Sequence, residues 1–81
     1  MFDINKNYYW ENALNGRYYI ARFQKDLLGD TVIMAYWGTE RTRLGGTKTW
    51  VVPQIENVQK MMERLHKIRC KHGYKEVKNL N

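Results

Sequence analysis

The sequence predicts an α+β domain, in which a twisted antiparallel sheet of about four strands packs against one C-terminal amphipathic helix. Two observations support this class. Residues 17–52 are rich in β-forming side chains divided by turn signals, and residues 54–72 repeat apolar side chains at helical spacing. A chain of 81 residues has room for one small core, so we expect residues 1–81 to form a single domain.

The first expected elements lie at the amino-terminal end. The aromatic run Tyr8-Tyr9-Trp10 is either a short first strand or an aromatic flap. Asn15-Gly16 is the signal of a two-residue hairpin turn, because both residues accept positive φ angles. A hairpin therefore opens the expected fold.

Residues 17–24 are expected to form the next strand, because their side chains alternate with a period of two. The alternation assigns three residues to the core face, which are Tyr19, Ala21 and Phe23. Residues 26–30 then form a turn around Gly29. We expect residues 31–37 to be the central strand, since apolar residues occupy both of its faces.

The second half of the expected sheet and the helix follow. Residues 38–46 are predicted to be a long loop, and residues 47–52 a strand that ends before Pro53. The helix predicted over residues 54–72 turns one apolar stripe to the sheet, made of Ile55, Val58, Met62, Leu65 and Ile68. Gly73 ends the helix, and Tyr74 to Val77 return as a short edge strand.

Composition narrows the function classes. The net charge is +6, and residues 60–78 hold seven of the fourteen basic residues, which favours a polyanionic partner. The single cysteine, Cys70, cannot form a disulfide within the chain, and residues 1–9 contain no apolar run. We therefore expect a cytoplasmic protein that does not bind a membrane.

Aromatic and basic residues gather where the central strand is expected to end. Trp37 and Gly38 come directly before a loop that contains Arg41 and Arg43, and Lys48 lies on the next strand. An indole beside guanidinium groups can offer a stacking surface and phosphate contacts together. The alternatives are a tryptophan packed in the core and arginines that only keep the protein soluble.

A basic ridge is predicted on the outer face of the helix. Its four residues follow at spacings of four, three and four, and they are Lys60, Arg64, Lys67 and Lys71. The ridge is either a set of phosphate contacts or an ordinary solvated helix face.

Six short segments in one order resemble the WGR domain family, which occurs in poly(ADP-ribose) polymerases and in small bacterial proteins. The segments, spread over residues 17–77, are Arg17-Tyr18-Tyr19, Asp26-Leu27-Leu28-Gly29, Trp37-Gly38-Thr39, Gly45-Gly46, the helix and Gly73-Tyr74. Two positions depart from the family pattern. Leu28 replaces an aromatic residue, and Thr39 replaces the arginine of the Trp-Gly-Arg motif.

The resemblance implies a non-catalytic DNA-binding module for DNA ends or nicks. It places Trp37 and Gly38 at the DNA-facing edge, with the indole stacked on a nucleotide at a strand end. Thr39 carries a hydroxyl and no charge, so it cannot replace the family arginine, but Arg41 and Arg43 can compensate from the same loop.

Other classes of function are less well supported. His66 and Cys70, four apart, with His72 nearby, mimic a metal-ligand pair, but no partner cluster exists elsewhere in the sequence. No nucleophile with its base can be recognised, so we expect no enzyme, no cofactor and no small-molecule substrate. The main alternative is a protein-interaction adaptor that uses an exposed aromatic patch, composed of Tyr8, Tyr9, Trp10, Tyr18 and Tyr36.

Overall fold

The computed structural model describes residues 1–40 and 45–77 of the chain. These residues form an α+β fold with a five-stranded antiparallel sheet and one C-terminal helix. The elements in chain order are β1 (Tyr8–Asn12), β2 (Arg17–Lys25), β3 (Thr31–Thr39), β4 (Gly45–Val52), α1 (Glu56–Lys71) and β5 (Lys75–Val77). The predicted class is confirmed, and the strand order across the sheet is β4-β3-β2-β1-β5.

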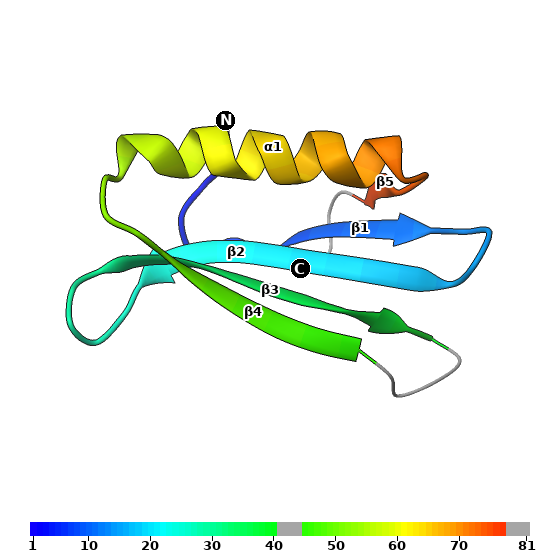
Figure 1. Cartoon of the computed structure of the whole chain (residues 1–81), viewed down its shortest axis with the longest axis horizontal. Coiled ribbons are helices and arrows are strands. Elements are labelled where there is room, and N and C mark those ends of the chain that lie inside the picture. Colours follow the sequence, from blue (N-terminus) through cyan, green and yellow to red (C-terminus); the bar gives the residue numbers. More distant parts are fainter. Residues whose placement is uncertain (41–44, 78–81) are drawn as a thin grey trace.

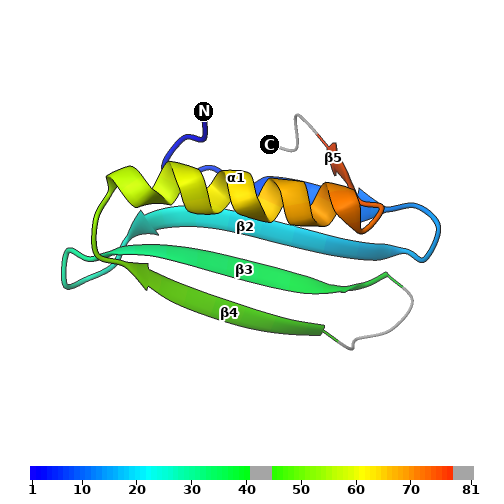
Figure 2. The ribbon, with the colours of Figure 1, turned by 45° about the horizontal axis from the view of Figure 1, so that its top comes forward.

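The helix covers one side of this sheet. Two views show α1 running above β1 and β2, whereas β4 extends beyond the helix (Figure 1, Figure 2). The side chains beneath the helix include Trp10, Ile33 and Met62, which have no exposed surface. The core therefore lies between α1 and the central strands, and the β3–β4 side of the same sheet face is only partly covered.

Tyr8-Tyr9-Trp10 is a strand and not a flap. β1 pairs with β2 from Tyr8↔Ala21 to Asn12↔Arg17. The connection between these strands contains four residues, 13–16, so the predicted two-residue turn was wrong. The Gly16 N–H closes the longer turn by donating to the Asn12 carbonyl at 2.9 Å, with Gly16 at φ 71°. Of the predicted turn signal, only the positive φ angle of Gly16 is confirmed.

β3 and β4 continue further than the sequence predicts. Trp37 pairs with Gly46 and Gly38 with Gly45, so both ends of the predicted loop belong to strands. The glycines permit this pairing because a Cβ on Gly45 would run into the Trp37 carbonyl oxygen, and one on Gly46 would meet the Trp37 ring. The lack of side chains, which predicts a loop from sequence, here allows two strands to approach.

The carboxyl-terminal strand was predicted correctly as an edge. β5 pairs with β1 through Tyr9↔Val77, Trp10↔Glu76 and Glu11↔Lys75, and it raises the strand number above the predicted four. β1 therefore lies inside the sheet, between β2 and β5.

The buried side chains of β2 follow the predicted alternation, whereas two residues of the predicted aromatic patch do not lie on the surface. Tyr19, Ala21 and Phe23 are buried, as expected. Tyr8 and Trp10 are 8% and 0% exposed, so they cannot belong to the surface patch predicted for a protein partner.

The apolar stripe of the helix also differs from the prediction at its ends. Val58 and Met62 are buried and Leu65 packs against the core, but Ile55 and Ile68 are exposed. Arg69, four residues after Leu65, continues the inward row in place of Ile68. Because residues four apart lie on the same face of a helix, Arg69 faces the sheet as Leu65 does. It places a positive charge over the Tyr19 ring.

Candidate nucleic-acid interface

A hollow of about 860 Å³ opens on the helix side of the sheet, beside the carboxyl-terminal half of α1. Its lining includes aromatic and cationic side chains from four elements and from the residue before β5, among them Arg17, Tyr19, Trp37, Lys48, Trp50, Arg69 and Tyr74. The register explains the grouping. Tyr19 pairs with Trp37, and Ala35 with Lys48, so these side chains leave the same face of the sheet. We call this feature the aromatic hollow.

Trp37 forms one wall of the aromatic hollow. Trp37 is 37% exposed, so its indole is partly covered by protein and partly open to solvent. The ring stacks with Tyr19 at 5.9 Å between centroids and 9° between planes, and it lies against the backbone of Gly46. These contacts hold the indole in one orientation and leave part of it open to a ligand.

Arg69 reaches the aromatic hollow from the helix. Its guanidinium carbon lies 4.4 Å from the Tyr19 ring centroid and 5.3 Å from that of Tyr74, so cation–π contacts hold the side chain. Its Nε is buried and has no hydrogen-bond partner among the described residues. An anionic acceptor in the hollow would therefore meet a guanidinium that is positioned by rings and not by a carboxylate.

The Tyr19 hydroxyl is neutral at physiological pH. Burial raises the pKa of Tyr19 above its ordinary value of 10.0, while the charge of Arg69 lowers it in part and Tyr74 adds to the rise. Tyr19 can therefore act as an apolar platform and as a hydrogen-bonding group, but it does not neutralise Arg69.

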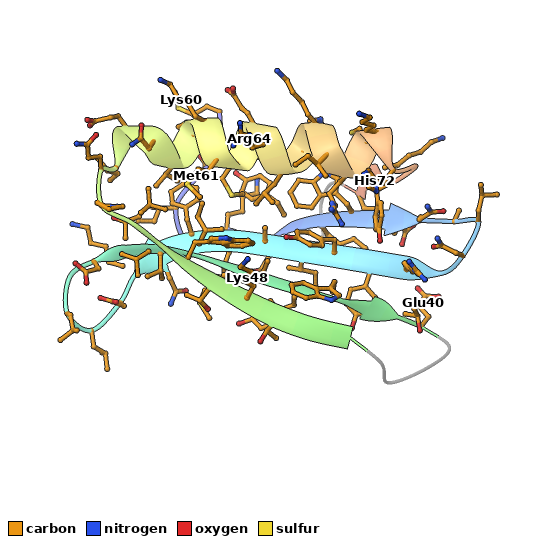
Figure 3. The ribbon with its side chains drawn as sticks, viewed as in Figure 1. Glu40, Lys48, Lys60, Met61, Arg64 and His72 are labelled. Atoms are coloured by element: carbon orange, nitrogen blue, oxygen red, sulfur yellow. The ribbon has the colours of Figure 1, made fainter. Side chains whose placement is uncertain are left out.

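Lys48 supplies a second cation, from β4. Its Nζ lies 5.2 Å from the Trp50 ring centroid, and the side chain leaves β4 on the side that faces α1 (Figure 3). Gly38 and Thr39 line the same hollow. Of the predicted loop residues, Arg41 and Arg43 lie outside the described residues.

The basic ridge does not form one surface with Trp37. Lys60, Arg64, Lys67 and Lys71 are all exposed, and Lys60 points away from the sheet (Figure 3). Arg64 lines a smaller hollow of about 190 Å³, which it shares with Trp50, Met61 and Leu65. The structure thus brings together Trp37, Gly38, Thr39 and Lys48 and leaves most of the ridge on the outer side of the helix.

Five of the residues named above as lining the aromatic hollow were not among the predicted site residues, and these are Arg17, Tyr19, Trp50, Arg69 and Tyr74. Tyr19 was predicted as a core residue, and Arg69 was assigned neither to the apolar stripe nor to the basic ridge. The signal that could have identified Arg69 is its spacing of four from Leu65, which places an arginine at an inward position.

His66 has a structural role. The Trp10 indole N–H donates to its Nδ1 at 3.0 Å, and Glu76 lies 3.6 Å from the same nitrogen. Cys70 Sγ is 3.6 Å from Nε2. Within residues 1–40 and 45–77, no group of three or more His, Cys, Asp or Glu side chains is arranged to hold a metal ion.

No family model, no curated protein and no solved structure matches this chain. Across the described residues we find no helix with the length and apolarity that a membrane-spanning segment requires.

Proposed function

We propose that this protein is a non-catalytic nucleic-acid-binding module of the WGR type, whose ligand is DNA with an exposed terminus such as an end or a nick. The observation that carries the proposal is the oriented, partly open Trp37 ring in a hollow whose charged lining residues, Arg17, Lys48 and Arg69, are all cationic. A base or sugar can stack on an indole, and phosphates can approach the cations beside it.

The basic residues lie in two separate places, and in this proposal each place contacts DNA differently. Arg69 and Lys48 lie with Trp37, whereas Lys60, Lys67 and Lys71 lie on the exposed helix surface. In this proposal the hollow holds the terminal nucleotide, and the ridge attracts more distant phosphates through longer-range charge. The proposal also assigns phosphate contacts to Arg41 and Arg43, which lie outside the described residues. Cys70, exposed and unpaired with any second cysteine, fits the proposed cytoplasmic location.

A fluorescence titration with nicked, blunt-ended and closed circular DNA tests the proposal. Trp37→Ala is expected to weaken binding to DNA termini by about 1–3 kcal/mol, whereas Trp37→Phe should retain most of the affinity, because both aromatic rings stack. Binding should fall with salt at a slope of about −0.9 per phosphate contacted. Wild-type protein that binds none of these DNAs at low salt would refute the proposal.

A matched pair of lysine variants separates the hollow from general charge. Lys48→Gln removes a cation that lines the hollow, while Lys25→Gln removes one exposed lysine at the far end of β2. We expect Lys48→Gln alone to weaken binding to DNA termini. An equal loss in both variants would mean that net charge, and not the hollow, determines affinity.

A protein-interaction adaptor is the second candidate, and the face of the sheet opposite α1 favours it. Tyr9 and Tyr18 stack there at 6.2 Å between centroids, and Tyr36 and Val51 are 37% and 60% exposed. An apolar surface of this kind on a small domain is typical of protein contacts. A salt-resistant complex that is lost in Tyr36→Ser, with DNA binding unchanged, would support this function.

A further inference from the structure

The free edge of β4 borders a small apolar groove. Among the described residues β4 pairs with β3 alone, so every second residue along Gly45–Val52 directs its backbone N–H and C=O away from the sheet. No proline interrupts these eight residues, and Pro53 follows them. The edge therefore offers a row of backbone donors and acceptors at strand spacing.

The groove beside this edge has apolar walls. It is the hollow of about 190 Å³ between β4 and α1, lined by Trp50, Met61, Leu65 and Arg64. This volume is below the range of about 300–1,000 Å³ that is usual for small-molecule sites. It suits one apolar side chain of a larger partner.

The charges at the groove are of one sign. Arg64 lines it, and Lys48 lies against Trp50 from the next inward position on β4. Both residues are exposed, and neither forms an ion pair that would neutralise it among the described residues. A partner that carries carboxylates would complement these two cations.

We infer that the β4 edge binds an extended acidic polypeptide, which adds to the sheet as a further antiparallel or parallel strand. The backbone groups of β4 select a polypeptide, because a nucleic acid has no matching row of N–H and C=O groups. One apolar side chain of the peptide rests on Trp50 in the groove. The acidic residues two positions before and after it, which share its face of the added strand, lie near Lys48 and Arg64. The groove shares Trp50 with the aromatic hollow and lies beside Lys48, whereas Trp37 lines the aromatic hollow alone of the two, so Trp37 variants separate peptide binding from DNA binding.

The probe is a blocked eight-residue peptide of threonine with valine at its fourth position and glutamate at its second and sixth positions, added to ¹⁵N-labelled protein. In an extended strand the valine and both glutamates face the same side. We expect amide shifts along β4 and at least tenfold slower hydrogen exchange at alternate β4 amides, the pattern that only strand addition produces. A peptide with prolines at its two central positions lacks two N–H donors, one of which would face β4, and should not bind. Equal binding of the proline peptide, or no change at β4 at millimolar peptide, would overturn the inference.

Matched protein variants test the charge and the groove. The double change Lys48→Gln and Arg64→Gln should weaken peptide binding about two- to thirtyfold, because exposed ion pairs contribute about 0.2–1 kcal/mol each. Lys25→Gln and Trp37→Ala should bind the peptide as the wild type does. If Trp37→Ala abolishes binding while its fold is intact, the peptide occupies the aromatic hollow and the β4 assignment fails.

Two other occupants would be recognised in the same experiment. Protection of alternate β4 amides that grows with protein concentration, without peptide, would assign the edge to a second copy of the chain. Nicked DNA that shifts these amides while the peptide leaves them unchanged would assign it to nucleic acid. Either result overturns the inference.

Discussion

Gly46→Ala is expected to displace Trp37 without removing any group from the chain. A Cβ built on Gly46 lies 2.7 Å from Cζ2 and 2.9 Å from Cε2 of the indole. Ordinary contact begins at 3.4 Å, so the ring must retreat by about 0.7 Å or rotate away from its stack with Tyr19. The change therefore moves the Trp37 ring, which is one wall of the aromatic hollow, without altering any side chain that lines it.

The expected magnitude differs for stability and for binding. Forcing a methyl group against a packed ring costs about 1–3 kcal/mol, and alanine returns about 0.5–1 kcal/mol relative to glycine within a strand. We therefore expect a net loss of roughly 0–2.5 kcal/mol in the free energy of unfolding. If Trp37 stacks on a nucleotide, its displacement should reduce affinity for DNA termini by up to about 1–3 kcal/mol.

Urea unfolding and a fluorescence titration with nicked DNA measure the two effects on one protein sample. Gly29→Ala is the matched control, because nothing lies within 4 Å of its added Cβ and only its φ of 86° is strained. We expect it to lower stability and leave DNA affinity unchanged. A Gly46→Ala protein that binds nicked DNA as tightly as the wild type would refute the role of the Trp37 orientation.

Further predictions concern the core and the helix contacts. Met62→Ala should lower the free energy of unfolding by about 2–5 kcal/mol in urea, because Met62 is fully buried. Trp10→Phe removes the donor to His66 Nδ1 and should cost about 1–3 kcal/mol, measured in the same way. Because the folded-state pKa of Tyr19 is raised, the stability due to its neutral phenol is present below pH 10 and is lost as the pH rises through the folded-state value. Arg69→Met should raise that pKa further, and an NMR titration of the Tyr19 ring that shows no rise would contradict the contact.

The sequence predicts the fold well where side-chain periodicity is strong. The period of two in β2 identifies Tyr19, Ala21 and Phe23 as buried, because a strand with one covered face must alternate. Prediction failed where a residue depends on its neighbour across the sheet. Gly45 and Gly46 indicate a loop along the chain, yet they are paired because they lie opposite Gly38 and the Trp37 ring.

The candidate site was harder to predict than the fold. Trp37 could be selected from its position at the end of an apolar run, but its partners come from strand register and helix rotation. Arg69 faces Tyr19 only because the inward row of α1 passes through Leu65 and continues four residues later. Local sequence contains no information on which residues of two distant elements come into contact. The aromatic hollow is formed by contacts of this kind, between residues of β2, β3, β4 and α1.

The pairing of β5 with β1 has a consequence for the order of folding. Because the last described strand completes the pairing of the first, a nascent chain that has reached only the end of α1 leaves one side of β1 unpaired. That open side borders Trp10, whose indole partner His66 is itself contacted by Glu76 of β5. During synthesis, one edge of β1 therefore stays open to other strands until residues 75–77 have left the ribosome.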